Sequence, residues 1–385
     1  MDKLFFTDEH IMIRNMVREF ADTEITPVAR DLDEQGEFPT ALVNKMGELG
    51  LMGILIPEEY GGSGLDMVAF ATAIIELARA DASVAITMAA HTSLGSLPIL
   101  MFGSDEQKNT YLPKLATGEM LGAFGLTEPD AGSDAGATKT KAVRDGNEYV
   151  VNGGKIFITN AGKAGVLSFT SQVIDNGKNL GIAAFSISTN TPGLEIGPKE
   201  KKMGWRASDT RQLFFKDMRI QATSMLGTPA NGFKTFLKTL TSGRVSIGAL
   251  SIGTALGAYE RALAYSTERI AFGKPINNFQ SVGFKLADMA TKIEASKLLV
   301  FHAAWMKDQG LDITKEAAMA KLFASETAME VTTEAIQIHG GYGYVKEYDV
   351  ERFFRDAKIL EIGEGTSEIQ RLIISREILK EIQIL

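Results

Sequence analysis

The sequence predicts an α+β protein in which a β domain lies between two α-helical domains, because the hydrophobic period changes twice along the chain. Residues 1–123 have helical spacing, residues 124–230 have short β-branched and aromatic runs between turn signals, and residues 231–385 return to helical spacing. A chain of 385 residues also exceeds what one hydrophobic core usually organises. We therefore expect three domains with these boundaries, packed into one body because no low-complexity linker separates them.

Helical periodicity defines the two flanking domains. Near the N-terminus, Ile13, Met16, Val17 and Phe20 fall on one helix face, and Thr7 precedes the pattern as a predicted N-cap. Alanines on one face of a later helix suit close packing in a four-helix bundle. The long C-terminal helical patterns are 244–269, 279–307, 314–338 and a last helix from Ser367.

The middle segment contains turn signals between strand-like runs. Asp145-Gly146 precedes Tyr149–Val151, and Asn176-Gly177 separates the runs 167–174 and 182–187. Such dipeptides favour tight hairpin turns between neighbouring strands. The middle domain is therefore predicted to be an antiparallel sheet.

Composition excludes several classes of site. The chain has no cysteine and only four separated histidines, without a His-x-x-x-His pair, so we expect no metal site. The net charge is −8, and the one tight basic cluster, Lys199, Lys201 and Lys202, is interrupted by Glu200, so nucleic acid is not an expected partner.

No targeting or membrane signal is apparent. The N-terminus has neither a signal-peptide core nor an Arg-rich transit pattern. The apolar stretch Met67–Ala78 is interrupted by Glu76 and is too short to span a membrane. We expect a cytoplasmic protein without membrane insertion.

The segment before the last helix places one carboxylate, Glu364, between Gly363 and Gly365. The glycines cannot shield Glu364, and Ser367 with Gln370 fits a capping box at the helix start. An exposed, adjustable carboxylate at a helix entrance is suited to act as a base. The alternative is a solvated Glu that the helix dipole favours, and on this segment alone that alternative is the stronger.

Four other segments could bind a ligand, although each has an ordinary structural reading as well. Residues 124–136 and 337–344 are rich in glycine and small polar residues that expose backbone N–H groups. Residues 152–160 place Phe157 and Thr159 on one strand face. Residues 269–280 include Arg269, whose guanidinium suits a pyrophosphate. Rossmann and P-loop signatures are both absent.

Taken together and in this order, these five segments resemble the acyl-CoA dehydrogenase family over essentially the whole chain, most strongly its short-chain, butyryl-type bacterial members. The resemblance implies two helical domains around a β domain, with the C-terminal domain a four-helix bundle. It also implies non-covalently bound FAD and a homotetramer. Cofactor-binding positions implied by the resemblance are Phe124, Leu126, Thr127, Ser133, Phe157, Thr159, Arg269, Phe272, Phe279, Gln280, Gln337, Ile338, Gly340, Gly341, Thr366 and Glu368. Of these, Arg269, Gln280 and the run Gln337–Gly341 would hold the FAD of a neighbouring subunit.

The resemblance also assigns a mechanism. Glu364 matches the family's catalytic base, which removes the α-proton of an acyl-CoA while the β-hydrogen leaves as hydride to flavin N5, and the base's own N–H helps to polarise the carbonyl. Burial should raise the pKa of this carboxylate and the helix N-terminus should lower it, and the sequence leaves the balance open. Substrate-binding positions implied by the resemblance are Ser133, Thr241, Arg244, Gly363, Gly365 and Arg376.

Two positions depart from the pattern of many relatives, and a third bears on where the base lies. Gly363 replaces a frequent Tyr, which predicts a pocket wide enough for branched or cyclic acyl groups as well as short linear ones. Thr241 replaces a frequent Asp, which leaves some substrate contacts open. Isovaleryl-type relatives carry the base on the helix near Arg244 instead, but Gly243 has no carboxylate, so Glu364 remains the candidate.

The resulting hypothesis is an FAD-dependent acyl-CoA dehydrogenase that forms the trans-2-enoyl-CoA and passes electrons to an electron-transferring flavoprotein. One alternative is an oxidase of the same fold that uses O₂. Another is a non-catalytic member that only binds flavin or acyl-CoA, which the presence of Glu364 disfavours. A glutaryl-type activity is also disfavoured, because the stretch Val84–Thr87 has no Arg to meet a terminal carboxylate.

Overall fold

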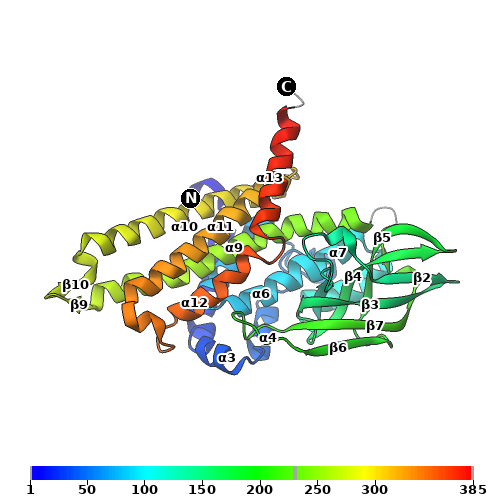
Figure 1. The fold of residues 1–385 in the computed structure, drawn as a ribbon, viewed down its shortest axis with the longest axis horizontal. Helices are drawn as coiled ribbons and strands as arrows, with labels where there is room; N and C mark the ends of the chain where they lie inside the picture. Colours follow the sequence, from blue (N-terminus) through cyan, green and yellow to red (C-terminus); the bar gives the residue numbers. More distant parts are fainter. Residues whose placement is uncertain (1, 229–231, 383–385) are drawn as a thin grey trace.

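The computed structural model describes residues 2–228 and 232–382, and the predicted order of helices, strands and helices is confirmed. Figure 1 shows the main sheet at one end of the molecule and a short two-stranded hairpin at the other, with long helices packed beside one another between them. The predicted boundary at 230–231 lies outside the described residues.

Short helices form the N-terminal part. The predicted N-cap of α2 is confirmed: the Thr7 hydroxyl accepts a hydrogen bond from the backbone N–H of His10, and the Thr7 N–H donates to His10 Nδ1 at 2.9 Å. This reciprocal pair satisfies two groups that a helix start leaves open. The helices are α1 (Asp2–Phe5), α2 (Asp8–Phe20), α3 (Ala29–Gln35), α4 (Thr40–Glu48), α5 (Met67–Ala80), α6 (Ala82–Ala90), α7 (Leu97–Phe102) and α8 (Asp105–Ala116), with a π-helical turn η3 (His91–Ser96) between α6 and α7.

One helical run in the described residues, Ala82–Phe102, is long and apolar enough to cross a membrane by length and composition. Of its most apolar window, 83% is buried inside the protein. A helix in the core of a folded protein is buried in this way, so this run is weak evidence for a membrane-spanning helix.

Most of the sheet is antiparallel, as predicted, and the hairpin turns at Asp145-Gly146 and Asn176-Gly177 join β2 to β3 and β4 to β5. However, β4 pairs in parallel with both β1 and β2. Turn signals predict pairing between consecutive strands only, so these crossover pairs had no local signal. The main strands are β1 (Leu121–Gly125), β2 (Lys141–Asp145), β3 (Glu148–Thr159), β4 (Ala164–Asp175), β5 (Lys178–Ser188), β6 (Leu194–Lys199), β7 (Thr210–Gln221) and β8 (Met225–Leu226), in the order β6-β7-β3-β2-β4-β5-β8 with β1 on β4.

The C-terminal part consists of long helices that share one hydrophobic core with the N-terminal helices. Ala317, Ala318 and Ala320 are fully buried, which confirms the predicted close packing of the alanine face. In Figure 1 the last helix projects away from this body. The elements are α9 (Gly232–Glu268), the hairpin β9 (Ile270–Ala271) and β10 (Lys274–Pro275), α10 (Gln280–Asp308), α11 (Thr314–His339), α12 (Val350–Ala357), the short helix η9 (Lys358–Glu361) and α13 (Ser367–Ile382).

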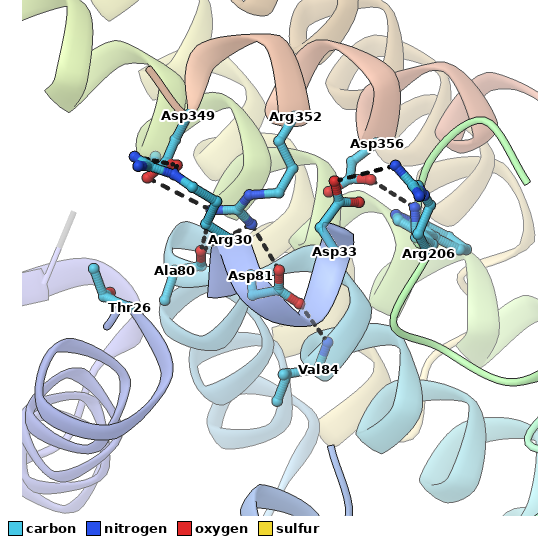
Figure 2. Close-up of polar contacts among 12 residues, drawn as sticks. Thr26, Arg30, Asp33, Ala80, Asp81, Val84, Arg206, Asp349, Arg352 and Asp356 are labelled. Atoms are coloured by element: carbon cyan, nitrogen blue, oxygen red, sulfur yellow. Dashed lines mark hydrogen bonds and ion pairs between the residues drawn. The ribbon is translucent and has the colours of Figure 1, made fainter. Parts of the chain in front are cut away.

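A buried charge network centred on α12 connects the three parts of the chain (Figure 2). Arg352 donates to Asp81 at 2.6 Å, and both side chains are almost completely buried. Asp356 accepts from the backbone N–H of Trp205, which follows strand β6, at 2.6 Å. Asp33 of α3 pairs with Arg355 at 2.7 Å. Since these contacts join residues from distant parts of the sequence, they help to hold the sheet and the two helical groups in one arrangement.

Candidate active site

Glu364 lies in the turn between η9 and α13, with its carboxylate directed at helix α9. Its backbone is left-handed, with φ of 53°, a conformation that costs energy for a residue with a side chain. Its Oε2 atom is buried and has no hydrogen-bond partner among the described residues. A Cβ atom added to Gly243 would stand 1.9 Å from this oxygen. The carboxylate therefore occupies the space that any other residue at position 243 would need.

Burial dominates the electrostatics of Glu364. Removal from water raises the pKa of the carboxyl group to about 7, while the charges of Lys321 and Arg244 act to lower this pKa. The sequence left open whether the pKa of Glu364 is raised or lowered, and in the structure the effect of burial is the larger, so this pKa is raised. The solvated helix-entry Glu, which was the alternative, does not describe this residue.

The backbone next to Glu364 is held by two buried side chains. Gly365 has φ of 97°, and its carbonyl oxygen accepts hydrogen bonds from Lys321 Nζ and Gln370 Nε2, both at 2.8 Å. The predicted capping box of Ser367 with Gln370 is therefore wrong. The hydroxyl of Thr366 caps α13 instead, by accepting from the Ile369 N–H at 3.3 Å, because the Gln370 side chain is turned toward Gly365.

Phe124 and Leu126, two of the predicted flavin-binding residues, lie close to this carboxylate. Both pack in a small apolar cluster that also contacts Leu94 of η3. Leu94 in turn lies 3.5 Å from the Cβ position of Gly243, where the Glu364 carboxylate sits. The fold thus brings the segment at 124–127 and the carboxylate to the same region, with Leu94 between them, although periodicity gave no reason to single out Leu94.

Phe157 and Thr159 lie on strand β3, next to that segment. The backbone N–H of Ile156 donates to the Thr127 carbonyl at 2.9 Å. Between Lys155 and Ile158 the register against β7 shifts, and Phe157 takes a φ of 61° with 63% of its surface exposed. This bulge interrupts the simple alternation that placed the two residues on one face, because a bulge adds a residue to one strand. It also presents the Phe157 ring to a ligand, while Thr159 remains half-buried.

Sequence reasoning missed a buried pair behind this segment. Lys155 is fully buried, and its Nζ contacts the Leu126 carbonyl at 3.1 Å and Glu128 Oε1 at 2.7 Å. Burial acts to raise the pKa of Glu128, but the Lys155 ammonium and the surrounding hydrogen bonds outweigh it and lower this pKa to about 2. Glu128 follows strand β1 and Lys155 lies on strand β3, so the two residues are far apart in the sequence. No local sequence pattern could have predicted that they pair.

The second group of predicted cofactor residues lies around the end of α11. Arg269, Ile338, Gly340 and Gly341 line a pocket of about 480 Å³, together with Tyr265, Ile276, His339, Tyr342 and Val345. Arg269 lies over the Tyr342 ring at 5.4 Å, and Cβ atoms added at the two glycines would meet nothing within 4 Å. Exposed backbone, a guanidinium and aromatic rings fit a dinucleotide well.

The remaining residues of this group lie on the nearby surface. Phe272, at the tip of the β9–β10 hairpin, is 96% exposed and meets the Phe279 ring at 6.0 Å. Gln280 and Gln337 are exposed at a helix start and near a helix end, where their amides can reach a ligand.

The two groups of cofactor residues lie far apart along α9, because Glu364 and Leu94 meet this helix at Gly243 and Arg269 follows its last residue. From Arg244 to Glu268 this helix is about 36 Å long, at about 1.5 Å per residue. In Figure 1 the β9–β10 hairpin and the sheet accordingly lie at opposite ends of the molecule. The structure therefore does not bring Arg269 to Phe157 within one chain.

The predicted substrate residues are distributed unevenly. Arg244 is buried beside the base, and its Nη1 donates to the half-buried Thr241 hydroxyl at 3.4 Å. Ser133 is exposed in the loop after β1. Arg376 is exposed on α13, about 14 Å along the helix axis from Ser367, so one chain alone does not bring it to Glu364. Glu368 is exposed in the first turn of α13.

Gly363 has no conformational reason to be glycine. Its φ is not positive, and a Cβ atom there would meet only the Ile359 carbonyl oxygen, at 3.4 Å. Gly365, in contrast, needs its left-handed backbone. The space beside Glu364 at position 363 is therefore open for a side chain that this protein lacks.

The sequence matches one known protein family along most of its length. The family models for the N-terminal, middle and C-terminal domains of acyl-CoA dehydrogenase match residues 7–119, 123–218 and 230–379. The chain belongs to the acyl-CoA dehydrogenase family, and it is an oxidoreductase that acts on CH–CH groups.

Individual relatives agree over nearly full length. The chain is 54% identical to a probable acyl-CoA dehydrogenase, YngJ, of Bacillus subtilis, over 97% of this chain and 99% of the relative. Butyryl-CoA dehydrogenase from Megasphaera elsdenii superposes with a TM-score of 0.94 at 43% identity, covering 97% and 98% of the two chains. A chain of the structure described as electron transferring flavoprotein of Acidaminococcus fermentans gives a TM-score of 0.94 at 45% identity, with the same coverage.

FAD is the cofactor of this protein. An acyl-CoA dehydrogenase complexed with FAD from Bacillus anthracis superposes with a TM-score of 0.92 at 37% identity, covering 98% of this chain and 68% of the other. The residues present here suit FAD, since the pocket at Arg269 and the exposed Phe157 ring offer a cation, open backbone and an apolar surface.

Proposed function

We propose that the protein catalyses α,β-dehydrogenation of a short-chain acyl-CoA to the trans-2-enoyl-CoA, with Glu364 as the base that removes the α-proton. The observation that carries this proposal is the enclosed Glu364 carboxylate, whose pKa burial raises to about 7. A base with a pKa near the working pH is ionised often enough to act and still holds the proton it takes.

The chain's own groups support each part of this step. Bound FAD supplies the acceptor for the hydride that leaves the β-carbon. Glu364 Oε2 lacks a hydrogen-bond partner among the described residues, so it is available for a substrate proton. No hydrogen bond within the described chain uses the Glu364 N–H, which leaves that donor free to polarise a thioester carbonyl. The Leu94 side chain lies between the carboxylate and the segment at 124–126, where it would exclude water from the reacting carbons.

The electron acceptor proposed is an electron-transferring flavoprotein. Support comes from the structural match to a chain of the electron transferring flavoprotein structure of Acidaminococcus fermentans. Oxygen, used by an oxidase of the same fold, is the alternative. The reduced enzyme should reoxidise slowly in air and rapidly with the flavoprotein, and rapid reoxidation in air would favour the oxidase.

The assembly proposed is a homotetramer in which each pocket at Arg269 binds the cofactor of a neighbouring subunit. The length of α9 supports this, because Arg269 and Phe157 are too far apart to serve one flavin within a chain. An Arg269→Ala substitution should weaken FAD binding while leaving the isolated subunit's fold intact. The cytoplasmic location remains a prediction.

Anaerobic titration of the purified yellow protein with butyryl-, 2-methylbutyryl- and cyclic acyl-CoAs tests the activity directly, because flavin absorbance bleaches on reduction.

Glu364→Gln should retain FAD, while its rate of flavin reduction falls about 10²–10⁴-fold with loss of the general base. Near-normal reduction by this variant would remove Glu364 from the role. In the unsubstituted enzyme the reduction rate should rise with pH through about 7, since only the ionised carboxylate accepts a proton.

Gly363 is proposed to widen the acyl pocket, because the space beside Glu364 is open at this position. Gly363→Tyr should therefore leave butyryl-CoA turnover largely intact and reduce kcat/KM for 2-methylbutyryl- and cyclic acyl-CoA about tenfold or more, as steric exclusion of a methyl group allows. A wild-type enzyme that already prefers linear chains strongly would contradict the wide pocket.

A further inference from the structure

Lys321 of α11 is an unusual residue for a helix core, because lysine is rarely fully buried without a carboxylate partner. Its side chain has no exposed surface, and among the described residues it forms no ion pair. Its ammonium group donates a hydrogen bond to the Gly365 carbonyl at 2.8 Å. A buried charge held this way calls for a reason beyond packing.

The carbonyl that Lys321 holds belongs to a strained part of the backbone. Glu364 and Gly365 have consecutive positive φ values of 53° and 97°. Gln370 Nε2, from α13, donates to the same Gly365 oxygen at 2.8 Å and to the Glu364 carbonyl at 3.4 Å. Donors from two different helices thus fix the turn that points the Glu364 carboxylate at Gly243.

Lys321 also faces Glu364 electrostatically. Burial raises the pKa of Glu364, and the charge that opposes this rise most is Lys321, followed by Arg244. Burial lowers the pKa of Lys321 to about 8, and the carboxylates that support its charged form are Glu364, Glu361 and Glu326, against the like charge of Arg244. The two buried groups therefore stabilise each other's ionised form.

We propose that Lys321 is a positioning residue for the base: its hydrogen bond to Gly365 holds Glu364 in its left-handed conformation, and its charge keeps the carboxylate ionised. This inference deepens the proposed function and rests on it. The hydrogen-bonding role and the charge role of Lys321 can be tested separately, because Gln370 also donates to the Gly365 carbonyl but carries no charge.

The test is the pH profile of single-turnover flavin reduction by butyryl-CoA, measured anaerobically on FAD-loaded enzyme. Lys321→Met should move the apparent pKa of the reduction rate upward by about one unit, from about 7 to about 8, which lowers the ionised fraction and hence the rate at pH 7 about fivefold. Lys321→Arg keeps a cationic donor and should restore most of the profile. Gln370→Leu should slow reduction without moving the apparent pKa.

Lys315→Met is the matched control, since Lys315 lies on the same helix but is partly exposed and pairs with Glu381 at the surface. It should leave the profile unchanged. A Lys321→Met enzyme that binds FAD and has an unshifted profile would overturn the proposal, and if that variant fails to fold, an unshifted profile in Lys321→Gln would overturn it equally. Failure of every acyl-CoA to reduce the unsubstituted enzyme would instead reject the proposed function itself.

Discussion

At the scale of single residues, the central pair is Glu364 and Gly243. The carboxylate at 364 fills the space in which a side chain at 243 would stand, so a side chain at 243 would have to displace the carboxylate. Relatives that place the base on the helix near Arg244 would need a small residue at the position of Glu364. In this chain position 364 carries a carboxylate and position 243 carries no side chain.

Gly243→Ala tests this exclusion. The added methyl group would collide with Glu364 Oε2, the end of a flexible side chain, and would displace it at a cost near the lower end of the about 1–3 kcal/mol typical of overpacking. We expect a lower free energy of unfolding in urea and a strongly reduced rate of flavin reduction. In a Glu364→Gly background the same substitution should cost little stability, and an equal cost in both backgrounds would contradict the steric argument.

At the scale of elements, strand β3 shapes one face of the predicted flavin site. Its bulge turns Phe157 outward, while Lys155, two residues earlier, points into the core and holds the Leu126 carbonyl and Glu128. Strand β3 therefore exposes the Phe157 ring on one side, and on the other side Lys155 fixes the segment at 126–128 by hydrogen bonds. The energetic basis is a buried ion pair, in which loss of one member leaves the other without compensation.

Lys155→Met should destabilise the protein by about 3–5 kcal/mol, because Glu128 would keep its charge in a buried site. FAD affinity should fall as well, since the segment at 126–128 loses its anchor. Urea unfolding and flavin fluorescence measure the two effects. The double variant Lys155→Met/Glu128→Gln should recover part of the stability, and strictly additive losses would argue against the pair.

At the scale of the whole molecule, the helices before and after the sheet form one hydrophobic core, and α12 joins them to the loop after β6. The contact between Arg352 and Asp81 lies at the centre of this junction (Figure 2). Asp81 also accepts from the Val84 N–H at 2.9 Å and so caps α6. Loss of this pair should therefore affect the whole fold rather than one domain.

Arg352→Met should lower the free energy of unfolding by about 3–5 kcal/mol, since it leaves the Asp81 carboxylate buried and unpaired. Asp81→Asn added to it removes that charge and keeps a capping group, so the double variant should be more stable than Arg352→Met alone. Thermal unfolding of the FAD-loaded protein measures both. A double variant no more stable than the single one would contradict a direct pair.

The sequence by itself determined the order of helices and strands, the cap at Thr7 and the two hairpin turns. These features depend on the spacing of apolar residues and on short motifs, which act over a few neighbouring positions. It was less informative on the parallel pairs of β4, on the bulge at Phe157 and on the cap of α13, where non-local contacts outweigh local preference.

Tertiary structure alone decided what surrounds the base. Gly243, Leu94 and Lys321 are distant from Glu364 in sequence, and packing brings them together. Packing likewise separates Arg269 from Phe157 along α9 and sets the pKa of Glu364 through burial. Desolvation and contact depend on which surfaces meet in space, which is why local sequence patterns identified the carboxylate but not its chemical state.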